Sequence, residues 1–121
     1  MRVAAWDIFW VQKYRHYAII VTANSQILGF LISSNPARDL DPESRIASAY
    51  AGISPADTDP SFLRHNSFVS CVKFFKFKEV ELTRRMGILL PNARRRIRDA
   101  AQKSRMSRKD KIKVNKAFSS R

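Results

Sequence analysis

The sequence contains little of what several common protein classes require. It has a single cysteine, so an intrachain disulfide is excluded, and one cysteine with two histidines is too few for an ordinary zinc site. Only three glycines are present, which excludes a glycine-rich phosphate loop. No run approaches the roughly 20 apolar residues of a membrane-spanning helix, and Asp7 interrupts the apolar residues that follow Arg2, unlike a secretory signal. We therefore expect a cytoplasmic protein with no metal, no cofactor and no membrane partner. Cys71 lies in an apolar run, which predicts a buried side chain rather than a nucleophile.

Acidic residues are scarce at one end of the chain. Residues 81–121 hold 14 of the 23 Lys and Arg residues but only three of the ten acids. The remainder is close to neutral, and the hydrophobic fraction of 45% is enough for a single domain with its own core. A near-neutral body with a strongly basic end predicts a fold that forms by itself and binds a polyanion, of which nucleic acid is the best candidate. The alternative is a basic surface that only keeps the protein soluble, as in ribosome-like proteins.

The first 80 residues alternate short apolar runs with polar breaks, a pattern typical of β-strands. Residues 17–32 predict an antiparallel hairpin, whose first strand is apolar throughout and is therefore expected to be buried on both faces. Gly29 indicates a bulge or a close backbone approach, and the proline-rich stretch 34–61 is expected to be a functional loop. The predicted strands are 6–11, 17–21, 27–32, 46–50, 62–72 and 74–77.

The basic end predicts two helices. Pro91 suits the first turn of a helix, and the residues from Ala93 to Ser104 place one narrow apolar face at helical spacing. A second helix is predicted near 108–118. We expect the cations opposite the apolar face, with two others, to bind nucleic acid: Lys13, Arg94, Arg95, Arg98, Arg105 and Lys109.

These elements predict a mainly β fold with an α tail. Short strands followed by helices favour a small, strongly curved barrel over a sandwich. The expected organisation is a β-barrel over residues 1–82, followed over residues 83–121 by a basic helical tail that packs on the barrel or extends from it.

Two polar clusters flank the predicted hairpin. Lys13, Arg15 and His16 precede its first strand, and Ser33, Ser34 and Asn35 follow its second. Because the start of one antiparallel strand lies beside the end of the next, both clusters should meet at one end of the sheet. His65, at another strand start, joins them if the barrel closes suitably. The alternative interpretation is that these residues are ordinary strand-start and turn residues.

Such a set of side chains matches the needs of RNA cleavage. A base must take the 2′-hydroxyl proton, an acid must protonate the departing 5′-oxygen, and a cation must stabilise the phosphorane. Arg15 is the candidate clamp, His16 or His65 the proton carrier, and Ser33 or Ser34 a donor to a phosphate oxygen. The candidate catalytic residues are therefore Arg15, His16, Ser33, Ser34 and His65.

Four segments resemble the MazF/PemK-like toxins of toxin–antitoxin pairs. Residues 6–11 resemble their "GDIWxV" opening, with Trp6 in place of the glycine before Asp7, and residues 15–21 resemble their "RRPALVIS" strand. Residues 31–34 resemble their "xxxTS" segment. Residues 62–71 are similar to "FLxHDSYVxC", a segment of a divergent branch of these proteins.

The resemblance implies an SH3-like barrel with a terminal helix, commonly dimeric. It implies metal-independent cleavage of RNA, held in check by an antitoxin, which we expect to be acidic. The family's catalytic arginine falls on Arg15, and its threonine or serine on Ser33 or Ser34. Two other functions remain open: a non-catalytic nucleic-acid-binding module that uses the basic helices, and a structural protein whose barrel docks another protein.

Overall fold

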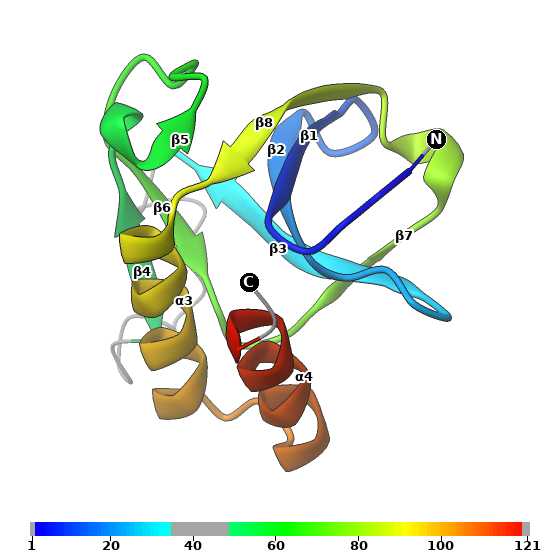
Figure 1. Ribbon diagram of the computed structural model, residues 1–121, viewed down its shortest axis with the longest axis vertical. Helices are drawn as coiled ribbons and strands as arrows, with labels where there is room; N and C mark the ends of the chain where they lie inside the picture. Colours follow the sequence, from blue (N-terminus) through cyan, green and yellow to red (C-terminus); the bar gives the residue numbers. More distant parts are fainter. Residues whose placement is uncertain (1, 35–48, 120–121) are drawn as a thin grey trace.

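The computed structural model describes residues 2–34 and 49–119. Within this part of the chain, eight strands form one curled antiparallel sheet that two helices follow (Figure 1). The predicted fold class, mainly β with a barrel-like sheet and C-terminal helices, is confirmed. The strands are β1 (Asp7–Val11), β2 (His16–Thr22), β3 (Ile27–Ser33), β4 (Tyr50–Ile53), β5 (Thr58–Asp59), β6 (Ser67–Ser70), β7 (Phe75–Phe77) and β8 (Arg84–Leu89). The helices are α3 (Pro91–Lys103) and α4 (Arg108–Ser119), with short 3-10 turns η1 (Pro55–Asp57) and η2 (Glu79–Glu81).

The sheet follows the order β4-β6-β3-β2-β1-β8-β5. The outer edge of β3 has two neighbours, because β6 pairs with its end at Ile32 and Ser33 whereas β7 pairs with its start at Ile27–Gly29. The predicted hairpin is confirmed as β2 and β3. Gly29 does meet a close approach, since a Cβ at this position would collide with the backbone carbonyl of Ile19.

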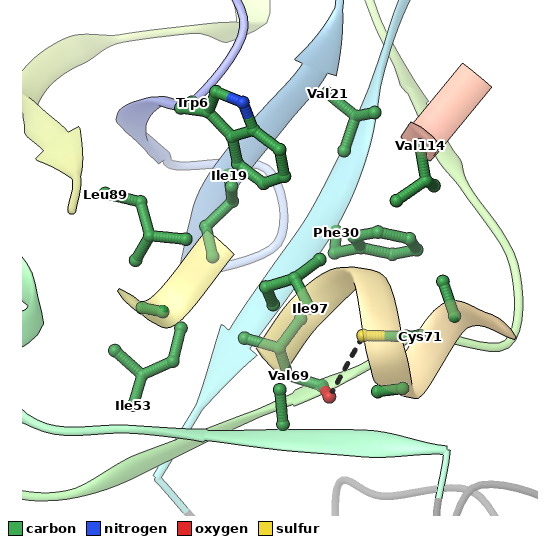
Figure 2. Close-up of a cluster of buried hydrophobic side chains, with 14 of the residues drawn as sticks. Trp6, Ile19, Val21, Phe30, Ile53, Val69, Cys71, Leu89, Ile97 and Val114 are labelled. Atoms are coloured by element: carbon green, nitrogen blue, oxygen red, sulfur yellow. Dashed lines mark hydrogen bonds between the residues drawn. The ribbon is translucent and has the colours of Figure 1, made fainter. Parts of the chain in front are cut away.

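Hydrophobic side chains fill both faces of the central strands. In β2, Ile19 and Val21 join the cluster that lies between the sheet and the two helices, whereas Ala18 and Ile20 join a second cluster on the other face. The expectation that this strand is buried on both faces is therefore confirmed. Figure 2 shows the first cluster, in which Cys71 is buried and its thiol donates to the Val69 carbonyl at 3.6 Å. Burial raises the pKa of this thiol, and the burial of Cys71 that the sequence predicts is confirmed.

Trp6 fastens the second helix to the sheet. Its side chain is fully buried (Figure 2), and its indole N–H donates to the Ala117 carbonyl of α4 at 2.9 Å. This buried hydrogen bond joins the residue before β1 to the last turn of α4. The Trp6 backbone has a φ of +72°, a conformation that favours glycine. Burial of the indole therefore has to offset about 1–3 kcal/mol of local strain.

Strand β8 was not predicted. It lies within the segment expected to be a helical tail, yet it pairs with β1 and carries β5 on its other edge. Its polar start, Arg84-Arg85, hid the strand pattern, and both arginines are exposed at the surface. Part of the predicted strand 46–50 and of the loop 34–61 lies outside the described residues.

Neither helix has the length and apolar character needed to cross a membrane, and the described residues contain no other helix that does.

The indole contact makes a testable difference between the two tryptophans. Trp6→Phe should lower the free energy of unfolding by about 2 kcal/mol, because it removes the buried hydrogen bond between the indole and the Ala117 carbonyl. Trp10→Phe is the matched control, since the Trp10 indole donates to the Gln12 side chain at an exposed position, and it should cost less than about 0.5 kcal/mol. Urea denaturation of both variants measures the difference. Equal decreases in the free energy of unfolding for the two variants would show that the hydrogen bond between Trp6 and Ala117 does not stabilise the packing of α4.

Candidate functional site

A pocket of about 300 Å³ opens at the end of the sheet where β1 turns into β2. Its walls come from β1, the start of β2, the end of β3 and the segment 62–67 that leads into β6. The charged and hydroxyl-bearing side chains at this pocket include Arg15, His16, Ser34, Arg64 and His65. The structure therefore brings together four of the five candidate catalytic residues, all except Ser33. Their catalytic role remains a prediction.

Strand register explains why these residues meet. Trp10 of β1 is opposite Tyr17 of β2, which in turn is opposite Ile32 of β3, and all three line the pocket. Paired residues of an antiparallel sheet point to the same face. His16 and Ser34, which lie next to this row, are therefore at the same end of the sheet, as predicted from the hairpin.

Arg15 occupies a strained position at the mouth of the pocket. The four residues between β1 and β2 form a tight turn in which the Arg15 amide donates to the Val11 carbonyl at 2.9 Å. A turn of this length commonly ends on a residue in the left-handed conformation, and Arg15 has a φ of +56°. Its side chain is exposed and makes no hydrogen bond or ion pair with the described residues. The guanidinium is therefore held at the pocket by its backbone and not by a carboxylate.

His16 is oriented by the neighbouring strand. Its Nδ1 lies 3.0 Å from the Ile32 carbonyl oxygen. A carbonyl oxygen only accepts hydrogen bonds, so we assign the proton to Nδ1. In the neutral ring this leaves the lone pair on Nε2. The imidazole at the pocket is thus fixed in the tautomer that accepts a proton through Nε2.

Aromatic rings form one wall of the pocket. The Tyr17 ring packs edge-on against Trp10, with centroids 5.1 Å apart, and against Phe62 at 4.8 Å. Phe62 belongs to the loop that also carries Arg64 and His65. Three aromatic rings beside exposed cations are the combination on which unpaired bases stack.

The two serines at the end of β3 separate. Successive residues of a strand point to opposite faces, and Ser34 lines the pocket whereas Ser33 lines a smaller hollow on the other side of His16. The sequence left the choice between Ser33 and Ser34 open, and position now favours Ser34 as the side chain that shares the pocket with Arg15.

The expected arginine face of the first helix is only partly exposed. Arg94 was predicted on the solvent side, and this is wrong: the residue is buried, its Nε donates to the Leu89 carbonyl at 2.6 Å, and its guanidinium lies over the Trp6 ring. The apolar face of α3 is wider than the sequence suggested, and the start of the helix turns Arg94 inward over β8. Arg94 therefore holds the fold together and is not available to a polyanion.

Other cations of this set also have partners. Arg98 bonds Asp99 at 3.0 Å and lies over the Phe118 ring of α4, at 4.3 Å from its centroid. Lys13 forms an ion pair with Glu81 at 3.0 Å, and this hydrogen bond raises the pKa of Lys13. The Glu81 carboxylate accepts hydrogen bonds from the Lys78 amide and from Lys13, which lower its pKa. Arg95, Arg105 and Lys109, which the sequence also predicted to bind nucleic acid, are exposed.

Two cations of α4 lie far from the pocket. Lys113 and Lys116 line a groove of about 860 Å³ together with residues around the turn from β2 to β3, Val21–Gln26 and Leu28. This groove is at the end of β2, whereas the candidate pocket is at its start. A seven-residue strand spans about 20 Å, so α4 and the pocket lie at opposite ends of the hairpin.

The sequence did not identify Arg64 as a site residue. Arg64 lines the pocket beside His65, and its place in the polar corner before β6 is the signal that could have indicated it. Arg84 does not line the pocket, but it pairs in register with Trp10 and so lies next to the aromatic wall; its position was not predicted because strand β8 was not predicted.

Comparison with known proteins does not identify a family for this chain. No protein-family model matches the chain, and no match is found among curated proteins. The resemblance to MazF/PemK-like toxins therefore stays a prediction, and the site has to be judged by its geometry.

The strained turn gives a stability test. Arg15→Gly should be at least as stable as the wild type, and more stable than Arg15→Ala by about 1 kcal/mol, because only glycine adopts a positive φ without strain. The same two substitutions at Arg64, which has no positive φ, are the control and should give the opposite order. Urea denaturation measures all four variants. A more stable Ala variant at position 15 would contradict the strained turn.

Proposed function

We propose that this protein is an RNA endonuclease of the toxin type that works without a metal ion. The observation that supports it is the convergence of an exposed arginine, an oriented histidine, a serine and a second histidine on one pocket. No carboxylate lines this pocket among the described residues, so its charge suits a phosphodiester.

In this proposal, His16 is the general base. Nδ1 donates to Ile32, so Nε2 takes the proton of the ribose 2′-hydroxyl. The 2′-oxygen then attacks phosphorus, the bond from phosphorus to the 5′-oxygen breaks, and His65 gives its proton to the departing 5′-oxygen. The products are a 2′,3′-cyclic phosphate and a 5′-hydroxyl.

Arg15 and Ser34 stabilise the phosphorane that forms between these steps. The forked guanidinium donates to two phosphate oxygens at once, and the hydroxyl of Ser34 donates to the charged oxygen as well. Strain at Arg15 fits this role, because left-handed residues concentrate at sites where the position of a side chain matters.

The aromatic wall selects unpaired RNA. Phe62 and the pair Trp10–Tyr17 offer rings for a base next to the phosphate, and a base can stack there only when it has left a duplex. The partner is therefore RNA in single-stranded form, encountered in the cytoplasm.

A toxin of this type requires an inhibitor protein, the antitoxin. An acidic and partly disordered segment of an antitoxin would compete with RNA for Arg15 and Arg64, whose exposed charges frame the pocket. The cationic pocket, rather than the helical tail, is the surface on which we place this competition.

Cleavage assays test the catalytic proposal. Arg15→Gly should lose at least about 100-fold in the rate of single-stranded RNA cleavage while remaining folded, and His16→Asn should lose about as much, because general base catalysis is worth about 10²–10⁴-fold. EDTA should leave the wild-type rate unchanged.

Lys109→Ala is the matched control, since it removes one positive charge from α4 without touching the pocket. Its rate should stay within about twofold of the wild type. Undiminished cleavage by Arg15→Gly, or complete inhibition by EDTA, would refute the proposed site.

Expression in growing cells tests the toxin proposal separately. Induction of the wild-type protein should stop growth and degrade cellular RNA, whereas the equally stable Arg15→Gly variant should permit growth. Growth curves and total-RNA gels compare the two at matched protein levels. Arrest by both variants would show that toxicity does not arise from the pocket.

A further inference from the structure

A second, smaller hollow lies beside the candidate pocket. It occupies the break along β3 where one neighbour ends and the next begins: β6 stops at Ser70, β7 starts at Phe75, and the residues between them leave the sheet. Its volume is about 100 Å³. Small-molecule pockets usually measure about 300–1,000 Å³, so this space suits one small chemical group.

Polar groups from four parts of the chain converge on this hollow. His16 comes from β2, Ser33 from β3, Ser70 from β6 and Lys73 from the segment between β6 and β7. None of the described residues that line it is acidic. A lysine and two hydroxyls with no carboxylate beside them form a set that suits a tetrahedral anion.

Lys73 is the cation of this set. Its Nζ lies 6.0 Å from the centroid of the Phe75 ring, which also lines the hollow. Contact with the ring keeps the ammonium group near the opening although the residue is exposed. His16 lines both this hollow and the candidate pocket, so the two spaces are neighbours that share one side chain.

We propose that this hollow binds the phosphate next to the one that is cleaved, an inference that rests on the proposed function. The RNA strand passes over His16, with the scissile phosphate on the side of Arg15 and Ser34 and its neighbour on the side of Lys73 and Ser33. Ser33 then has a role in binding, separate from that of Ser34. The substrate is a single strand with at least two successive phosphates.

The first experiment removes the negative charge of the RNA phosphate and the positive charge of Lys73, separately and together. An RNA oligonucleotide that the protein cuts is made uncleavable by a 2′-deoxy sugar, and a neutral methylphosphonate replaces the phosphate on either side of the cleavage position. One of the two replacements should weaken binding to the wild type about tenfold. Lys73→Met should bind the unmodified strand about tenfold more weakly and should show no further loss with that same replacement.

Salt dependence gives an independent readout. The slope of log K against log salt should fall by about 0.7 in Lys73→Met, the value for one phosphate contact on a single strand. Lys76→Met is the matched control, because Lys76 is exposed on β7 but lines neither the hollow nor the candidate pocket, and it should bind like the wild type. Independent, multiplying losses from the methylphosphonate and from Lys73→Met would overturn the proposal, as would wild-type binding by Lys73→Met.

A titration with inorganic phosphate separates this inference from the proposed function. If the protein neither binds nor cuts RNA, the proposed nuclease fails, but the hollow can still be observed by NMR. Phosphate should shift the amide signals of Ser33, Ser70 and Lys73 in the wild type, and these shifts should be lost in Lys73→Met. Signals that stay unmoved in the wild type up to high phosphate concentration would show that the hollow binds no phosphate.

Discussion

The register of the three central strands determines which side chains meet at the candidate site. Val11 opposite His16, and Tyr17 opposite Ile32, place the turn before β2 beside the end of β3. Because side chains alternate between faces, a slip of one residue would move His16 and Tyr17 to the wrong sides of the sheet. Hydrophobic packing opposes that slip, because it would exchange Ala18 and Ile19 between the two buried faces, leaving one cluster underfilled and the other overfilled. The same core that stabilises the fold therefore fixes the position of the polar residues at its end.

The two basic helices pack against the sheet, and some of their side chains and carbonyl groups form hydrogen bonds with it. Trp6 ties α4 to the sheet through the Ala117 carbonyl, and Arg94 closes the gap between α3 and β8 by donating to the Leu89 carbonyl. The helical end of the chain contains most of the positive charge, yet part of that charge satisfies backbone and carboxylate groups inside the protein. The number of cations in the sequence therefore overstates how many positive charges at this end of the chain can contact a polyanion. The pocket around Arg15 is the better candidate for that contact.

Local patterns predicted the parts of the structure that depend on local chemistry. The apolar run 17–21, the turn residues after it and the run 27–32 gave the hairpin correctly, and the hairpin alone was enough to bring Arg15, His16 and Ser34 to one place. The burial of Cys71 was likewise predicted correctly from the apolar residues around it in the sequence.

The failures involve contacts between distant parts of the chain. The inward turn of Arg94 depends on Trp6 and Leu89, and strand β8 depends on pairing with β1, so neither could be seen in a window of a few residues. The hollow that Ser33 lines exists because β6 ends at Ser70 and β7 begins at Phe75, and this break could not be seen near Ser33 in the sequence. The left-handed Trp6 stands where the resembled family has a glycine, and only the burial of its side chain explains how a tryptophan is accommodated there.

A crystal structure of the protein bound to an uncleavable, 2′-deoxy-substituted RNA strand would show whether RNA binds at the candidate pocket. We expect a phosphate between Arg15 and Ser34 with the modified sugar facing His16 Nε2, and a base against Phe62. A strand that lies along α3 and α4 instead, with the pocket at the β1–β2 turn left empty, would contradict this expectation and would make this protein a nucleic-acid-binding module that uses its helices.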